Sequence, residues 1–142
     1  MAPHVKYTKK GDIHCIELGL PGLERIIIDY SSIPADQRSG LAKQLLAASA
    51  LSCYVAALSG SLEARDAAYS SIEAEASMEL GPNAAGQGRV RSMHLDVSVK
   101  LDPSSMPVFE RCARIMKNGC LVTGSLHEGI HMTYSLKAEN QN

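Results

Sequence analysis

Residues 45–55 read Leu-Leu-Ala-Ala-Ser-Ala-Leu-Ser-Cys-Tyr-Val, inside a longer run of strong helix formers from Leu41 to Ser59. Apolar side chains recur on nearly every side of this helix, so we expect other parts of the fold to cover it all around. Gly60 then predicts its C-terminal end. The apolar run itself, residues 45–58, is too short to span a bilayer and is typical of a buried core helix.

Strands are expected on both sides of this helix. Residues 5–18 predict a hairpin with a Gly-containing turn, and a third strand carries the run of isoleucines at 26–28. Beyond the helix, residues 72–80 and 93–99 alternate between apolar and polar side chains, which indicates two half-exposed strands. The Gly-rich stretch between them turns the chain, so these two strands form an antiparallel hairpin.

The remaining third of the chain predicts two helices and one strand. Ser104 or Ser105 can cap a helix with an apolar stripe, and Gly119 ends it. A short helix from Cys120 to Leu126 and a final strand from Ile130 to Leu136 follow. We therefore expect an α+β fold over residues 1–142: a single domain with an antiparallel β-sheet packed on a central buried helix.

Composition narrows the class of function. The chain has 142 residues, 45% of them hydrophobic, which is enough for a core without covalent staples. Basic and acidic residues number 14 and 15, so there is no electrostatic case for binding nucleic acid. The first residues contain no secretory segment, which predicts a cytoplasmic protein with no membrane partner. In a reducing compartment the four cysteines are expected to be thiols or redox centres.

Two of the cysteines occupy similar settings. Cys53 and Cys120 both have small and polar neighbours, which leave room for another atom to approach the sulfur. If they meet in the fold, they form a dithiol that can cycle through a disulfide. Cys120 follows Gly119 in the first turn of a helix, where free N–H groups and the dipole favour an anion. The residues alone thus favour Cys120 as the more acidic thiol. The alternative is that both are ordinary core cysteines.

Together these settings resemble the OsmC/Ohr family, the osmotically inducible and organic hydroperoxide resistance proteins. The first family motif is an apolar helix that ends in Ala-(Ala/Ser)-Cys-(Phe/Tyr), and residues 51–54 read Leu-Ser-Cys-Tyr. The second reads Cys-Pro-(Val/Tyr)-Ser-x-(Ser/Ala)-Leu, and residues 120–126 read Cys-Leu-Val-Thr-Gly-Ser-Leu. The order of elements and the cysteine separation agree as well, so that the resemblance covers residues 5–136.

This resemblance implies an intertwined homodimer with two sites at its interface, and a thiol-dependent peroxidase that needs no cofactor. Cys53 would be peroxidatic: its thiolate attacks an organic hydroperoxide and becomes a sulfenic acid. Cys120 would be resolving, because it condenses with that sulfenic acid to form a disulfide. A dithiol reductant, lipoyl or thioredoxin-like, would then restore both thiols.

The sequence departs from the family pattern near the first cysteine. Lys43 stands where the family has a glutamate, and the first hairpin has no arginine to pair with the thiolate. Arg25 or Arg38 is a candidate replacement, and Lys43 could itself supply the positive charge. The alternative is that Lys43 is a solvated lysine of the first helical turn. Leu121 replaces the usual proline.

Two other functions remain open. The chain could be a divergent dithiol redox protein that lost peroxide turnover with its Glu–Arg pair, or a non-enzymatic protein with a small apolar ligand in an interface pocket. Cys15 and Cys112 are predicted to be structural. His127 and His131 have a spacing that suits zinc on a helix, but Gly129 interrupts that helix. We therefore expect no metal.

Overall fold

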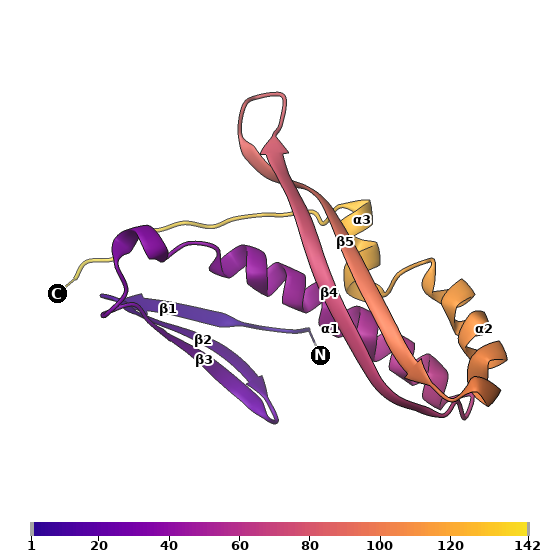
Figure 1. The fold of residues 1–142 in the computed structure, drawn as a ribbon. Helices are drawn as coiled ribbons and strands as arrows, with labels where there is room; N and C mark the ends of the chain where they lie inside the picture. The colour runs from indigo at the N-terminus through magenta and orange to yellow at the C-terminus, as the bar shows by residue number, and fades with distance from the viewer. Residues whose placement is uncertain (1, 142) are drawn as a thin grey trace. The chain divides into compact units, whose positions relative to one another are not determined.

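The computed structural model describes residues 2–141, which form two compact units that meet in sequence at Leu41. The first unit is a three-stranded antiparallel sheet in the order β1 (Lys6–Lys10), β2 (Ile13–Leu20) and β3 (Leu23–Asp29), shown in Figure 1. Lys10 pairs with Ile13 across a tight turn, as the Gly-containing sequence predicts. A short 3-10 turn, η1 (Ala35–Gln37), lies between β3 and the long helix that follows.

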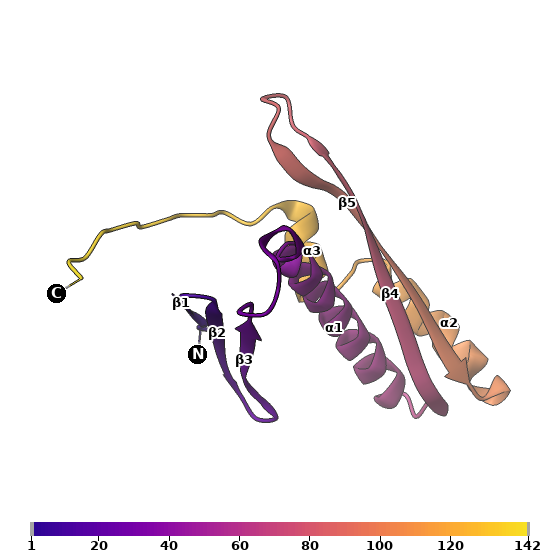
Figure 2. The same cartoon turned by 60° about the vertical axis from the view of Figure 1, so that its left-hand side comes forward.

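The second unit contains the long helix and the long hairpin. Helix α1 (Leu41–Glu63) leads into β4 (Tyr69–Pro82) and β5 (Gly88–Leu101), which pair antiparallel along almost their whole length. After the 3-10 turn η2 (Pro103–Ser105) come α2 (Met106–Met116) and α3 (Leu121–Glu128). Figure 2 shows the hairpin lying alongside α1, with α2 at its base. The predicted α+β class and the antiparallel hairpins are thus confirmed.

The core of this second unit lies where α1, α2 and the base of the hairpin meet. Leu58 and Leu62 from α1 pack with Cys112 and Met116 from α2, and Leu62 and Cys112 are completely buried. Half-buried side chains of both strands cover this cluster. The apolar stripe that the sequence predicts on α2 therefore faces the core.

Helix α1 differs from its prediction at its end. It runs through Gly60 to Glu63, and the backbone N–H of Ala64 still donates to the Gly60 carbonyl at 3.0 Å. A glycine inside a helix costs about 1 kcal/mol. Burying a leucine contributes about 1.5–3 kcal/mol, and the additional turn buries Leu62. The free energy gained by burying Leu62 outweighs the cost of placing Gly60 inside the helix.

Few residues of α1 are fully buried. Its buried residues are Ala47, Ala50, Leu58 and Leu62. The whole segment Ala35–Glu63 is also long enough to cross a membrane, unlike its apolar run alone. Its most apolar stretch of 18 residues has a mean hydropathy of 1.7, and 22% of that stretch is buried. The core helix of a soluble assembly has the same length and composition, so this feature alone does not place the chain in a membrane.

The predicted final strand over residues 130–136 is wrong for the isolated chain. From Gly129 to residue 141 the chain is irregular, and Tyr134 and Leu136 are 85% and 99% exposed. A strand needs a neighbour that satisfies its backbone groups. Among residues 2–141, no other strand pairs with this segment.

Candidate dithiol site

The structure brings Cys53 and Cys120 together. Cys53 lies on α1, Cys120 directly precedes the first residue of α3, and each of the two thiols shifts the pKa of the other. The backbone N–H of Val122 also donates to Cys53 Sγ at 3.4 Å. Both cysteines are half-buried free thiols. Two sulfurs from distant parts of the sequence thus share one small site.

Glycine at position 119 makes the turn into this site possible. Its φ of +74° lies in the left-handed region that favours glycine, and its N–H donates to the Met116 carbonyl at the end of α2. A Cβ at this position would lie 2.7 Å from Thr123 Oγ1. A larger residue would therefore disturb the side chain of Thr123, which contacts Cys120.

Thr123 holds Cys120 at the start of α3. The backbone N–H of Cys120 donates to Thr123 Oγ1 at 2.9 Å, and Thr123 Oγ1 lies 3.2 Å from Cys120 Sγ. Because the hydroxyl oxygen accepts from the N–H, its own hydrogen is free to donate to the sulfur. The backbone N–H of Thr123 also points to this sulfur, which completes a reciprocal cap. Our sequence reasoning missed Thr123, although a hydroxyl residue three positions after a helix-capping residue is the signal of such a cap.

These contacts separate the acidities of the two thiols. The hydrogen bond with Cys120 raises the pKa of the Cys53 thiol; burial and the charge of Cys120 act in the same direction, and the N–H groups of Val122 and Leu121 oppose them. Burial raises the pKa of the Cys120 thiol, but hydrogen bonds from Cys53, from Thr123 and from backbone N–H groups outweigh burial and leave it lowered. Within one chain, Cys120 is thus the more acidic thiol.

Replacing Thr123 tests this assignment. We expect Thr123→Val to raise the pKa of Cys120 and to slow its alkylation at pH 7 by about tenfold or more, since a hydrogen bond to a charged group contributes about 1.5–3 kcal/mol. Peptide mass spectrometry after timed iodoacetamide treatment, repeated across pH, measures both effects. Thr123→Ser keeps the hydroxyl and should react like wild type. Equal rates in all three proteins would show that the hydroxyl does not stabilise the thiolate.

Two of the three candidate cations, Arg38 and Lys43, have other surroundings within their own units. Arg38 belongs to the first unit, where it donates to the Ile33 carbonyl at 2.7 Å, pairs with Asp12 at 2.9 Å and lies over the Tyr30 ring. Lys43 is exposed in the first turn of α1, ten residues before Cys53, or about 15 Å along the helix axis. It lines a depression at the tip of the hairpin rather than the dithiol. A role for either residue at Cys53 stays a prediction.

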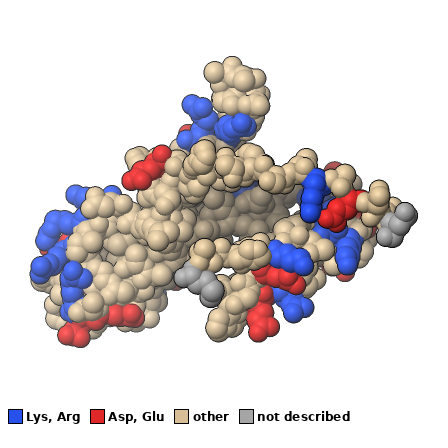
Figure 3. Space-filling model, turned by 180° about the vertical axis from the view of Figure 1, so that it is seen from behind, with Lys and Arg blue, Asp and Glu red and all other residues tan. Residues whose placement is uncertain are grey.

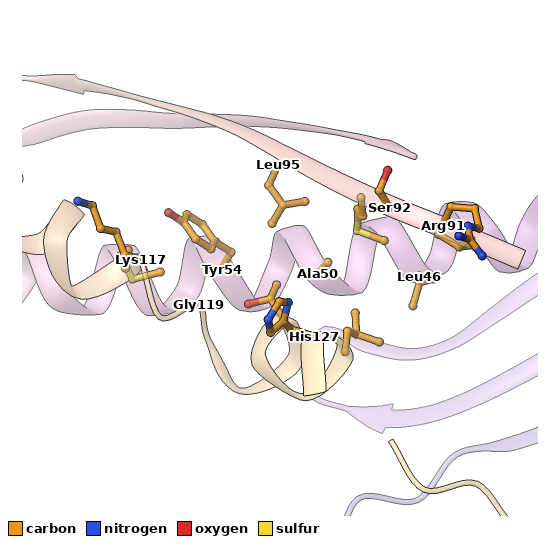
Figure 4. A pocket seen from close by; sticks show the side chains of 14 residues that line it. Leu46, Ala50, Tyr54, Arg91, Ser92, Leu95, Lys117, Gly119 and His127 are labelled. Atoms are coloured by element: carbon orange, nitrogen blue, oxygen red, sulfur yellow. The ribbon is translucent and has the colours of Figure 1, made fainter. Parts of the chain in front are cut away.

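A groove lies next to the dithiol within the second unit (Figure 4). Its volume is about 590 Å³. Helix α1 contributes Leu46, Ala50 and Tyr54, and the other linings come from β5 and from the segment between the end of α2 and the end of α3. Thr123 lines the groove and also contacts Cys120, so it connects the two.

The other cysteines and the histidines have simpler settings. Cys112 is completely buried and accepts a hydrogen bond from Ser61 Oγ at 3.1 Å, which confirms its structural assignment. Cys15 lies half-buried on β2. Helix α3 ends at Glu128, so His127 and His131 do not share a helix. Within the described part of the chain, no three His, Cys, Asp or Glu side chains lie together as metal ligands would.

Comparison with known proteins gave one family and several solved structures. The family model of OsmC-like proteins matches residues 42–135. An OsmC-like protein of unknown function from Vibrio cholerae aligns with a TM-score of 0.68 at 17% identity, over 88% of this chain and 93% of the other. A candidate osmotic-stress-induced and detoxification-response protein from Psychrobacter arcticus gives 0.59 at 24% identity, over 92% and 89%.

A third solved structure, an OsmC-like protein from Mycoplasma pneumoniae, has a TM-score of 0.62 at 16% identity, over 89% of this chain and 88% of the other. At these identities the likeness shows the fold alone. No curated protein matched the sequence.

Proposed function

Because this chain belongs to the OsmC-like protein family, we propose that it is a thiol-dependent peroxidase that reduces organic hydroperoxides. The observation that carries this proposal is the pair of free thiols, Cys53 and Cys120, which lie close enough for each to shift the pKa of the other. The family resemblance assigns the peroxidatic role to Cys53 and the resolving role to Cys120. The site would work in the cytoplasm with a lipoyl or thioredoxin-like dithiol as reductant.

The lowered pKa of Cys120 gives the first proton a destination. Cys53 passes its proton to the Cys120 thiolate, and the Cys53 sulfur attacks the outer oxygen of the hydroperoxide. The O–O bond breaks, the alkoxide leaves and is protonated to the alcohol, and Cys53 becomes a sulfenic acid. Cys120 sulfur then attacks the sulfenic sulfur, hydroxide leaves as water after protonation, and a disulfide forms. In total, two thiols and one hydroperoxide give a disulfide, an alcohol and water.

The surroundings of the site favour an organic peroxide over hydrogen peroxide. Leu121 follows Cys120 directly and its side chain is 81% exposed, while Tyr54 follows Cys53 on α1. An apolar group on the peroxide would remove part of this surface from water, at about 25 cal/mol per Å² of apolar area. Hydrogen peroxide offers no such surface.

A second candidate function is binding without turnover. The groove beside the dithiol has the volume of a ligand site, and no lysine or arginine of the second unit is among the groups that shift the pKa of Cys53. Lys43 stands where the family has a glutamate, and the loss of that carboxylate supports binding without turnover. It equally supports a dithiol redox protein that no longer turns over peroxide.

Counting thiols distinguishes these functions. The reduced protein has four thiols per chain. We expect one equivalent of cumene hydroperoxide to remove two of them, because one disulfide forms per peroxide. Titration in denaturant before and after peroxide makes buried Cys112 countable, and a following excess of dithiol should restore all four. No loss of thiols, and no peroxide consumption with any dithiol, would contradict the peroxidase proposal and favour the binding protein.

A further inference from the structure

Helix α2 carries a basic stripe on the face that it turns to solvent. Arg111, Arg114 and Lys117 follow one another at intervals of three residues, and all three side chains are exposed. Residues three apart on a helix are neighbours, so the three cations form one stripe about 9 Å long. Figure 3 shows Lys and Arg side chains gathered at the outer edge of the second unit, where α2 lies.

The positive charge of this stripe is largely uncompensated within the chain. Glu110 is the one carboxylate of α2, and it is exposed as well. Among residues 2–141, the ion pairs join Arg38 to Asp12 and Lys137 to Glu139, so no cation of the stripe is paired with a carboxylate. Like charges on neighbouring helical positions repel one another, and an anionic surface placed over them relieves that repulsion.

The stripe leads directly to the dithiol. Lys117 follows the last residue of α2, and Figure 4 shows it shortly before Gly119 at one end of the groove. Cys120 is three residues beyond Lys117, which is at most about 11 Å along the chain. A standard protein interface covers about 800 Å² on each partner, which is roughly 30 Å across. One partner surface that reaches Cys120 can therefore also cover the whole stripe.

We propose that the basic stripe of α2 is the docking surface for the protein that reduces the Cys53–Cys120 disulfide, and that this partner carries an acidic surface around its own dithiol. The inference rests on the proposed peroxidase function, because turnover creates the disulfide that must be reduced. The partner's thiolate attacks one sulfur of the disulfide, and the other sulfur leaves as a thiolate and takes up a proton. The partner's second thiol loses its proton and displaces the first sulfur, which is protonated in turn. The partner becomes a disulfide and both thiols of the site are restored.

A protein fits this face better than a membrane does. An amphipathic helix binds a membrane by burying its apolar face among the lipids. The apolar face of α2 is turned inward, where Cys112 and Met116 belong to the core. The exposed large apolar side chains of α2 are Met106 and Ile115, near its two ends. The stripe thus offers charge with little apolar area, which suits a transient encounter with an oppositely charged protein.

The rate at which Cys120 reacts with charged peptides tests the proposal without peroxidase activity. The protein carries Cys15→Ser and Cys53→Ser, which leave Cys120 as the accessible thiol because Cys112 is completely buried. The probes are two peptides of equal length, one rich in glutamate and one with glutamine in its place, each with a cysteine activated by thionitrobenzoate. The Cys120 thiolate attacks the peptide sulfur, and coloured thionitrobenzoate leaves.

At low salt we expect the acidic peptide to react about tenfold faster, since electrostatic steering raises association rates by about 10–10³-fold. The difference should vanish in about 1 M salt, where the screening length falls to about 3 Å. Arg111→Glu with Arg114→Glu should remove the advantage of the acidic peptide, and the milder Arg111→Gln with Arg114→Gln should reduce it to about threefold. An unchanged rate with the glutamine peptide shows that each variant is folded.

The matched control is Lys10→Glu with Arg89→Glu, which changes the net charge by the same amount on β1 and β5, outside α2. It should keep the tenfold preference. Equal rates for both peptides at low salt would overturn the proposal, and so would an equal loss of preference in the control, because overall charge alone would then explain the effect.

Two further outcomes are distinguished. Sedimentation with phosphatidylglycerol vesicles that depends on Arg111 and Arg114, without a preference between the peptides, would assign the stripe to a membrane and overturn the protein partner. A failure of the peroxidase itself would appear in the thiol counts of the wild-type protein and would leave the peptide rates unaffected.

Discussion

Cys53→Ser should abolish the consumption of organic hydroperoxide, whereas Cys120→Ser should consume one peroxide per chain and then stop. Only the attacking sulfur takes oxygen from the peroxide, and only the resolving sulfur removes it again as water. The stalled Cys120→Ser protein should carry a sulfenic acid on Cys53. Dimedone labelling with peptide mass spectrometry locates it, and stopped-flow consumption of cumene hydroperoxide measures the single turnover.

Cys15→Ser is the matched control, because it removes a half-buried cysteine from β2 without touching the dithiol. It should turn over like wild type. The reverse pattern, with Cys120→Ser inactive and dimedone on Cys120 of Cys53→Ser, would show that the two sulfurs exchange roles. Activity in both variants, or in neither the variants nor wild type, would contradict the dithiol mechanism.

An exchange of roles between Cys53 and Cys120 is a real alternative, because Cys120 is the more acidic thiol within one chain. Hydrogen bonding and burial raise the pKa of Cys53, while the Thr123 contacts help to lower that of Cys120. An attack by Cys53 therefore needs Cys120 as the proton acceptor, or a cation from Arg38 or Lys43 in an assembled protein. A charge beside a thiolate can outweigh a helix-dipole effect of at most about 2 kcal/mol.

Local patterns predicted most of the secondary structure. The alternation in residues 72–80 and 93–99 follows the two faces of the β4–β5 hairpin, and the half-buried residues fall on the predicted face. The predicted end of α1 at Gly60 was wrong because the burial of Leu62 in the core extends the helix. The local helix propensity of Gly60 cannot show that burial. The last strand was wrong for a related reason: pairing depends on a neighbour that the local sequence does not specify.

The candidate site was likewise only partly predictable from the sequence. The settings of Cys53 and Cys120 allowed the sequence to identify the pair that the structure brings together. Thr123 was missed because its effect depends on the precise turn at Gly119, which places its hydroxyl against the Cys120 sulfur. The groove was missed because its linings come from four elements that are far apart in the sequence.

We also expect the protein to be a dimer of the 15.2 kDa chain, with strands of both copies around two central helices. The isolated chain leaves much of α1 uncovered, although its composition is that of a core helix. Its C-terminal segment alternates, and its four apolar side chains are all exposed: Ile130, Met132, Tyr134 and Leu136. A period-2 segment with one apolar face is what a strand needs to join the sheet of another chain.

Charging that face should separate the copies. Tyr134→Asp with Leu136→Asp places two carboxylates where apolar groups would be buried, and an unpaired buried charge is strongly destabilising. Sedimentation equilibrium at micromolar concentration should then give the mass of one chain, against two for wild type. Thr133→Asp with Ser135→Asp is the matched control, because these residues alternate with the apolar ones and point to the other face. It should remain dimeric. A stable wild-type monomer would exclude a shared site, and the cation for Cys53 would then have to come from the same chain.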